Sequence, residues 1–142
     1  MKNNYNCYTF SEISVGQKES FSVTITQEMM DSFRAITGDV NPLHADLEYA
    51  ISKGYNNCVV YGMLTSSFLS TLAGVYLPGK YSLIHTVENS MLKPVFVSDT
   101  LTVTGEVKEK DDVFSTLQLK ITIQNQNGEK VCRGKMRVGV TA

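Results

Sequence analysis

The chain has 142 residues, of which 42% are hydrophobic and 19% are charged, and its formal net charge is −1 at pH 7. These values are typical of one globular domain, which we expect to span residues 1–142. No stretch approaches the roughly 20 apolar residues that cross a bilayer, and no run of Lys or Arg forms a basic stripe, so neither a membrane nor a nucleic acid is an expected partner.

The first predicted elements are a strand and a helix. Up to Gly16 we expect an irregular lead segment, and the alternation of polar and apolar residues over 20–25 then indicates a half-buried strand. Thr26 is a suitable N-cap for a helix over 27–37, and Gly38 ends it because glycine readily takes the left-handed conformation. Three apolar residues share one face of this helix and are expected to pack: Met29, Phe33 and Ile36.

The loop over residues 37–46 holds the strongest candidates for chemistry. Asp39 and His44 are five residues apart, and Asn41-Pro42 favours a turn between them. Such a turn can fold a carboxylate and an imidazole towards one another. This pair suits water activation, since the carboxylate can accept a proton from water while the imidazole orients that water. The same residues also fit a simple turn in which Asp39 only follows the end of a helix.

A short helix and a long apolar helix are predicted next. Asp46 is expected to cap the short helix, which ends near Gly54. The long helix runs over 62–75 and is apolar on nearly every face, which predicts a position in the interior. Gly62 at its start would let a ligand carbonyl approach the first backbone N–H groups, which carry partial positive charge.

The rest of the chain is predicted to be β-strand. A long extended segment covers 82–97, with Pro94 indicating a bulge or an edge position, and Asn127-Gly128 is a hairpin turn signal. Shorter alternating strands are expected over 101–108, 117–124 and 136–140. One buried helix and roughly five mostly sequential, antiparallel strands predict an α+β fold, with the sheet wrapped around the central apolar helix.

The cysteines and the N-terminal residues indicate a cytoplasmic protein. The three cysteines (Cys7, Cys58 and Cys132) are an odd number, are widely spaced and form no Cys-x-x-Cys pattern. This argues for reduced thiols and against a disulfide framework or a zinc site. Cys58 is interpreted as a small buried hydrophobe. Residues 1–6 are polar and lack the apolar core of a signal peptide.

Two motifs resemble the MaoC-like family of hot-dog-fold dehydratases, which includes the (R)-specific enoyl-CoA hydratases. The first is Asp-Val-Asn-Pro-Leu-His-Ala-Asp over 39–46, and the second is Tyr-Gly-Met-Leu over 61–64, where Tyr61 replaces the usual His. Further similarity over 77–80 and 93–99 extends the resemblance to most of the chain. It implies a hot-dog fold and hydration of trans-2-enoyl-CoA, or the reverse dehydration of (R)-3-hydroxyacyl thioesters.

The resemblance also implies roles for individual residues. Asp39 and His44 would bind the catalytic water, and the amide N–H of Gly62 would form the oxyanion hole. Substrate contacts are expected from Asn41, Tyr61, Met63 and Ser70. For Ser70, close packing of the helix on the sheet is an equally good explanation. No metal or cofactor is implied, and the expected partner is an acyl-CoA or acyl-carrier-protein thioester.

The expected assembly is a homodimer or a higher homo-oligomer. A hot-dog protomer leaves one sheet edge and part of its helix uncovered, and pairing of two sheets edge to edge would satisfy that exposed edge.

Two other functions compete with a hydratase. Hot-dog acyl-thioesterases generally place a carboxylate on or near the central helix, whereas residues 62–75 contain none. A non-catalytic acyl-thioester-binding subunit is suggested only by Tyr61. The intact pair of Asp39 and His44 argues against a protein that has lost catalysis.

Overall fold

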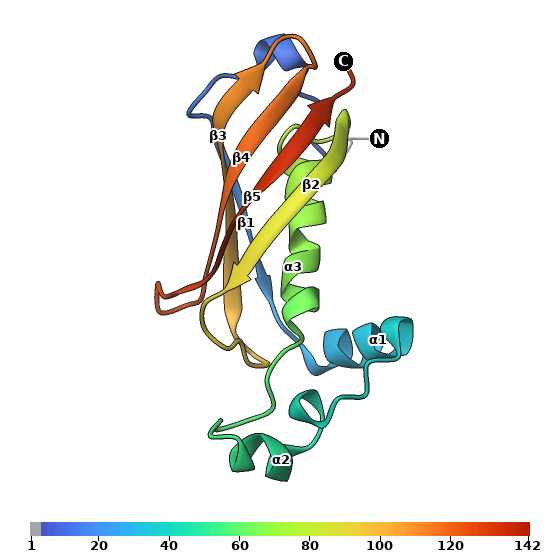
Figure 1. Ribbon diagram of the computed structural model, residues 1–142, viewed down its shortest axis with the longest axis vertical. Coiled ribbons are helices and arrows are strands. Elements are labelled where there is room, and N and C mark those ends of the chain that lie inside the picture. Colours follow the sequence, from blue (N-terminus) through green and yellow to red (C-terminus); the bar gives the residue numbers. More distant parts are fainter. Residues whose placement is uncertain (1–3) are drawn as a thin grey trace.

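The computed structural model describes residues 4–142, and residues 1–3, at the start of the predicted lead segment, lie outside the described residues. A five-stranded antiparallel sheet in the order β1-β3-β4-β5-β2 lies against the helix α3 (Figure 1). The strands are β1 (Lys18–Thr24), β2 (Ser82–Met91), β3 (Thr100–Asp111), β4 (Thr116–Gln124) and β5 (Lys130–Val140). The predicted α+β fold, a sheet wrapped around an apolar helix, is confirmed.

The helices fall into two groups. Near the sheet lie α3 (Gly62–Thr71), which continues into the π-helical η3 (Leu72–Tyr76), and the short 3₁₀-helix η1 (Phe10–Glu12). At one end of the molecule lie α1 (Gln27–Thr37), the 3₁₀-helix η2 (Pro42–His44) and α2 (Leu47–Ser52). None of the helices among residues 4–142 is long and apolar enough to cross a membrane.

The core forms between α3 with η3 and the inner face of the sheet. Alternate residues of β3, β4 and β5 are almost completely buried: Leu101, Val103, Val107, Leu117, Leu119, Ile121, Ile123, Met136 and Val138. The bare Cα of Gly105 in β3 lets η3 approach the sheet, because a Cβ there would lie 2.8 Å from Cδ2 of Leu72. The alternation read from the sequence therefore identifies the buried face correctly.

The predicted extended segment over 82–97 is too long, because β2 ends at Met91. The chain then turns away from the sheet, and the carbonyl oxygen of Val95 accepts a hydrogen bond from the amide of Val60 (2.8 Å). Pro94 consequently lies in a connection between strands, and its predicted place at a bulge or a strand edge is wrong.

Residues 26–61, which we call the arm, project from the end of the sheet and contain α1, η2 and α2 (Figure 1). The predicted helix ends are confirmed. Thr26 Oγ1 accepts the amide N–H of Met29, and Asp46 Oδ1 accepts that of Tyr49. Gly38 follows α1 with a φ of 71°, the left-handed conformation that favours glycine.

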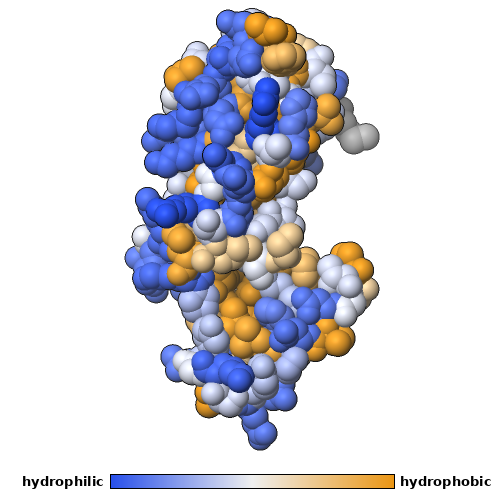
Figure 2. All heavy atoms as spheres, viewed as in Figure 1, coloured by the Kyte–Doolittle hydropathy of each residue, from blue (hydrophilic) through white to orange (hydrophobic). Residues whose placement is uncertain are grey.

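Two predicted burials are wrong, one on α1 and one at Cys58. On α1, Ile36 is 83% exposed, whereas Met30, on another face of the same helix, is only 1% exposed. Cys58 is half-buried, and the fully buried cysteine is Cys132 in β5. Periodicity marks an apolar face correctly, but whether another element covers that face depends on the tertiary arrangement. Figure 2 shows hydrophobic residues left on the surface of the arm.

Candidate active site

The Asn-Pro loop is held by its own side chains. The Asp39 carboxylate accepts the amide N–H of Asn41 through Oδ1 (3.1 Å), and Oδ1 of Asn41 in turn accepts the amide N–H of Leu43 (2.9 Å). The second bond caps η2, and the two short-range bonds together fix the turn that the sequence predicts. The side-chain oxygen of Asn41 is thereby used within the loop, while Oδ2 of Asp39 makes no hydrogen bond to any residue from 4 to 142.

The His44 imidazole is held in one orientation. Its Nδ1 lies 2.7 Å from the carbonyl oxygen of Val59, in the segment that leads into α3. A carbonyl oxygen can only accept a hydrogen bond, so Nδ1 carries the hydrogen, and Nε2 of the neutral ring keeps a free lone pair. This second nitrogen makes no hydrogen bond within the described residues 4–142. His44 can therefore bind a water proton at Nε2.

Tyr61 connects the two candidate residues. Its side chain is only 1% exposed, and its hydroxyl donates to the backbone carbonyl oxygen of Asp39 (2.8 Å). The His44 ring stacks on the Tyr61 ring, with the centroids 4.1 Å apart. Tyr61 therefore forms an inner wall of the site, and its hydroxyl is engaged inside the protein.

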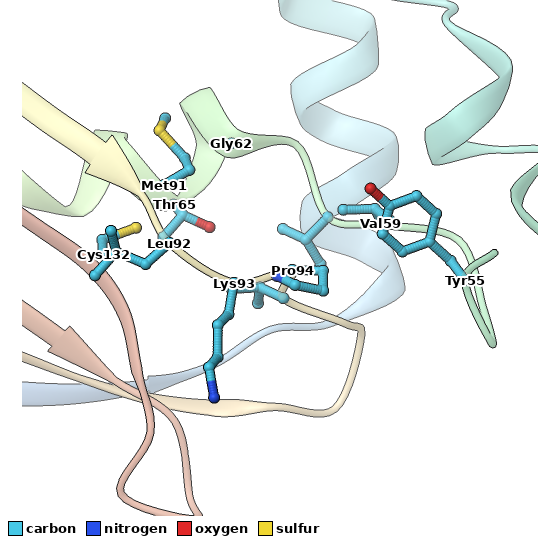
Figure 3. A pocket seen from close by; sticks show the side chains of 11 residues that line it. Tyr55, Val59, Gly62, Thr65, Met91, Leu92, Lys93, Pro94 and Cys132 are labelled. Atoms are coloured by element: carbon cyan, nitrogen blue, oxygen red, sulfur yellow. The ribbon is translucent and has the colours of Figure 1, made fainter. Parts of the chain in front are cut away.

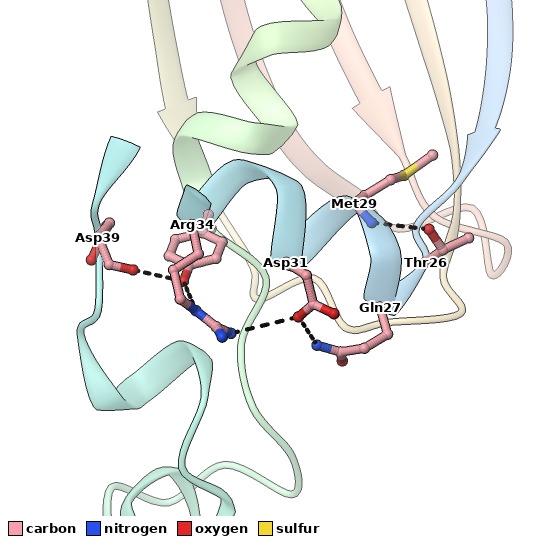
Figure 4. A network of polar contacts seen from close by, with 7 residues as sticks. Thr26, Gln27, Met29, Asp31, Arg34 and Asp39 are labelled. Carbon is pink, nitrogen blue, oxygen red and sulfur yellow. Dashed lines mark hydrogen bonds and ion pairs between the residues drawn. The ribbon is translucent and has the colours of Figure 1, made fainter. Parts of the chain in front are cut away.

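Arg34 is a member of this network that the sequence did not suggest. Its Nε donates to the Tyr61 hydroxyl oxygen (3.2 Å), and its guanidinium lies 3.9 Å from the Asp31 carboxylate (Figure 4). The bond to Tyr61 raises the pKa of Arg34, so its charge is retained. Only the fold could reveal this contact, because 27 residues separate Arg34 from Tyr61 in the sequence.

The structure brings Asp39 and His44 together through Tyr61, with no direct hydrogen bond between their side chains. They also line different cavities. Asp39 and Met63, which is 67% exposed, line a cavity of about 380 Å³. His44 and Arg34 line one of about 420 Å³. The turn between them forms as expected, but the side chains are organised around Tyr61.

Gly62 is the first residue of α3, and its amide N–H points out of the helix start, with no acceptor in the described part of the chain. A Cβ at this position would lie 3.2 Å from Cε of Met91, so a larger side chain would press on the Met91 side chain. Gly62 lines a third cavity, of about 290 Å³, together with Thr65 and Cys132 (Figure 3). Burial raises the pKa of the Cys132 thiol, which therefore stays protonated near neutral pH.

Ser70 lies two turns further along α3 and is exposed. It lines neither the Asp39 cavity nor the Gly62 cavity of the single chain. Its exposure also contradicts the alternative of close packing between helix and sheet.

Comparison with known proteins places this chain in a family. The sequence pattern described as "MaoC like domain" matches residues 11–129. The chain belongs to the MaoC-like family. The resemblance inferred from the two motifs is thus confirmed over most of the sequence.

Similar MaoC-like relatives include two proteins named (R)-specific enoyl-CoA hydratase. One, from Aeromonas caviae, is 36% identical over 79% of this chain and 85% of its own length. The other, from Rhodospirillum rubrum, is 31% identical over 94% of this chain and 92% of its own.

Solved structures of MaoC-like proteins share the fold. The (R)-hydratase from Aeromonas caviae superposes with a TM-score of 0.86 at 33% identity, over 90% of this chain and 97% of that one. An unliganded R-hydratase from Pseudomonas aeruginosa also gives 0.86, at 28% identity, over 93% and 84% of the two chains. The predicted hot-dog fold is confirmed by these neighbours.

Proposed function

We propose that this protein is an (R)-specific enoyl-CoA hydratase, which adds water to trans-2-enoyl thioesters or catalyses the reverse dehydration. The observation that carries the proposal is the pair of free acceptor atoms in one loop, Oδ2 of Asp39 and Nε2 of His44. Tyr61 bonds to the backbone carbonyl of Asp39 and stacks on the His44 ring. The names and the high coverage of the two relatives support the same reaction.

A water held between Asp39 and His44 would carry out the addition. Its oxygen forms a bond to C3 of the enoyl group, while the C2=C3 electron pair moves towards the thioester carbonyl. The Asp39 carboxylate accepts a proton from the attacking water, and His44 Nε2 orients that water. The protonated Asp39 carboxyl group then gives a proton to C2 and returns to the carboxylate, so the net change is the addition of one water. Acid–base groups positioned in this way typically contribute about 10²–10⁴ in rate.

The amide N–H of Gly62 would stabilise the charge that develops on the thioester oxygen. It lies at the positive end of the α3 dipole, where backbone N–H groups lack partners within the helix. Removal of one oxyanion-hole donor typically costs about 10²–10³ in rate. The acyl part of the substrate then lies on the side of Asp39 and Met63, so that C3 can meet the water.

The first test replaces the two candidate catalytic residues. Asp39→Asn keeps an oxygen for the Asn41 amide, and His44→Asn keeps an amide nitrogen near the position of Nδ1, so both variants should retain the loop. We expect each to lower kcat on crotonyl-CoA by about 10²–10⁴, measured as loss of the conjugated thioester absorbance. His44→Ala should lose as much activity.

Circular dichroism and thermal unfolding provide the control that the variants are folded. A folded variant that kept more than about a tenth of the wild-type kcat would rule out the proposed acid–base role of that residue.

We also propose that the protein forms a homodimer through β2. This strand is one edge of the sheet, and it exposes Leu83, Val87 and Met91 by 57%, 47% and 48%. Edge pairing would cover the unpaired backbone groups and these side chains, and a stable dimer typically buries roughly 1,600 Å². Sedimentation equilibrium at micromolar concentration should give about twice the 15.7 kDa chain mass. A single species at 15.7 kDa would contradict the dimer.

A further inference from the structure

The cavity beside Gly62 contains a buried hydroxyl group without a partner. Thr65 is 1% exposed, and its Oγ1 makes no hydrogen bond within the described chain. Figure 3 shows this hydroxyl turned towards the space between Gly62, Val59 and Pro94. Buried hydroxyl groups normally have a partner, so an unpaired one that lines a cavity indicates a missing ligand or water.

The local helix geometry does not provide a partner for the Thr65 hydroxyl. Its neighbour Ser67 makes the usual backward bond, donating from Oγ to the carbonyl oxygen of Leu64 (2.6 Å). For Thr65 the corresponding acceptor is the Gly62 carbonyl oxygen, and the hydroxyl makes no bond to it. The Tyr61 carbonyl oxygen, one residue further back, already accepts the amides of Leu64 and Thr65 (3.0 and 3.2 Å). The hydroxyl is therefore left available to a group in the cavity.

The size and lining of the cavity restrict that group. Its volume of about 290 Å³ far exceeds the 10–15 Å³ or so that one water needs. Most of the lining is apolar, including Val59, Met91 and Pro94. The cation of Lys93, which also lines it, is paired with Glu129 at 2.6 Å. A narrow, mostly apolar chain with one neutral polar group fits this lining better than an ion.

The direction in which the substrate lies identifies the group that enters the Gly62 cavity. This step rests on the proposed function, in which the thioester oxygen meets the Gly62 amide and the acyl part lies on the side of Asp39. The Asp39 cavity and the Gly62 cavity share no lining residue. A substrate whose acyl part occupies the first cavity and whose carbonyl oxygen meets the Gly62 amide would place the sulfur side of the thioester in the second. In coenzyme A and in acyl carrier protein, two methylene groups and then an amide follow that sulfur.

We propose that the Gly62 cavity binds the pantetheine arm of the thioester, and that the Thr65 hydroxyl hydrogen-bonds to its first amide. A hydroxyl group can donate to the amide oxygen or accept from the amide N–H. Thr65 is then a positioning residue, which places the thioester carbonyl against the Gly62 amide.

The test compares two crotonyl thioesters in wild type and in Thr65→Val, which removes the hydroxyl and keeps the shape. One substrate is the N-acetylcysteamine thioester, which carries the amide, and the other is an S-alkyl thioester of the same length without it. For Thr65→Val we expect kcat/KM to fall by about 3- to 10-fold on the amide substrate and by less than about 2-fold on the alkyl substrate. Thr65→Ser should restore the activity on the amide substrate.

Ser67→Ala is the matched control, because it removes a hydroxyl from the same helix outside this cavity, and it should alter neither rate. If Thr65→Val does not fold, Thr65→Ala removes the same hydroxyl. Equal losses on both thioesters would mean that Thr65 supports the structure or holds a water only, and this would overturn the proposal. No loss on either would overturn it as well.

Calorimetric binding of butyryl-CoA, which has no double bond to hydrate, separates this inference from the proposed function. In one outcome, wild type hydrates neither thioester, but Thr65→Val weakens butyryl-CoA binding about 3-fold or more and Thr65→Ser does not. The pantetheine site is then supported and the proposed hydratase activity is contradicted. If wild type hydrates both thioesters and Thr65→Val does not discriminate between them, the hydratase activity is supported and the pantetheine site is contradicted. If wild type neither hydrates nor binds, both are wrong.

Discussion

The sheet with α3 and the arm are stabilised in different ways. In the sheet, side chains such as Leu119 and Ile121 are fully buried, and four antiparallel strand pairs join β1 to β2. In the arm (residues 26–61), only a few side chains are comparably buried, namely Met30, Ala50, Val60 and Tyr61. Five large apolar residues of the arm are exposed instead: Ile36, Val40, Leu47, Tyr49 and Ile51.

The difference shows how this protein holds its candidate catalytic side chains in place in a region that remains accessible. Asp39 and His44 both lie in the arm, where little apolar burial is available to fix them. Helix caps and loop hydrogen bonds do part of this work, and Tyr61 joins the loop to α1 and to the start of α3. Local stability of this kind is typically lower than that of a packed sheet. The arm is therefore the region in which a single side chain can alter the site without unfolding the domain.

The largest expected effect is in the sheet. Leu119→Ala in β4 removes a side chain with 0% exposure, and we expect a loss of about 2–5 kcal/mol in the free energy of unfolding because a cavity remains. Ile36→Ala in the arm, at 83% exposure, should change it by no more than about 0.5 kcal/mol. Urea denaturation followed by circular dichroism measures both. Similar losses for the two variants would contradict the contrast between the regions.

A smaller and local effect is expected at Tyr61. Tyr61→Phe keeps the ring that stacks on His44 but loses the hydrogen bond to Asp39. The cost should be about 0.5–1.5 kcal/mol, which corresponds to at most roughly a tenfold loss of kcat/KM on an enoyl-CoA. Hydrogen exchange should become faster in residues 39–46, whereas exchange in β4 should change little, because the loop opens without global unfolding.

Tyr76→Phe is the matched control in η3. Its ring stacks on Phe21, and its hydroxyl makes no hydrogen bond within the 4–142 segment, so neither activity nor exchange should change. A nearly inactive Tyr61→Phe variant would instead make the hydroxyl an essential acid. If wild type were inactive and Tyr61→His gained activity, Tyr61 would be the residue that prevents catalysis, and the protein would be a non-catalytic acyl-thioester-binding subunit.

The sequence by itself determined the elements whose signals are local. Period-two alternation identified the strands of the core, and the caps at Thr26, Gly38 and Asp46 follow from side-chain chemistry within a few residues. The motif over 39–46 was enough to name Asp39 and His44 as candidates, and together with the motif over 61–64 it indicated the MaoC-like family, because the residue types and spacing of the first motif are specific.

Only the tertiary structure decided what depends on distant neighbours. β2 ends at Met91, and the connection that follows turns back so that the Val95 carbonyl accepts the Val60 amide. Pro94 marks an irregularity here, but it does not specify that the chain leaves the sheet. The exposure of Ile36 depends on which faces the fold covers, which its periodicity cannot specify. The bond of Arg34 to Tyr61 and the unpaired hydroxyl of Thr65 likewise arise from packing. Satisfaction of a polar group is a property of its surroundings in space, so a sequence can name the group but not its partner.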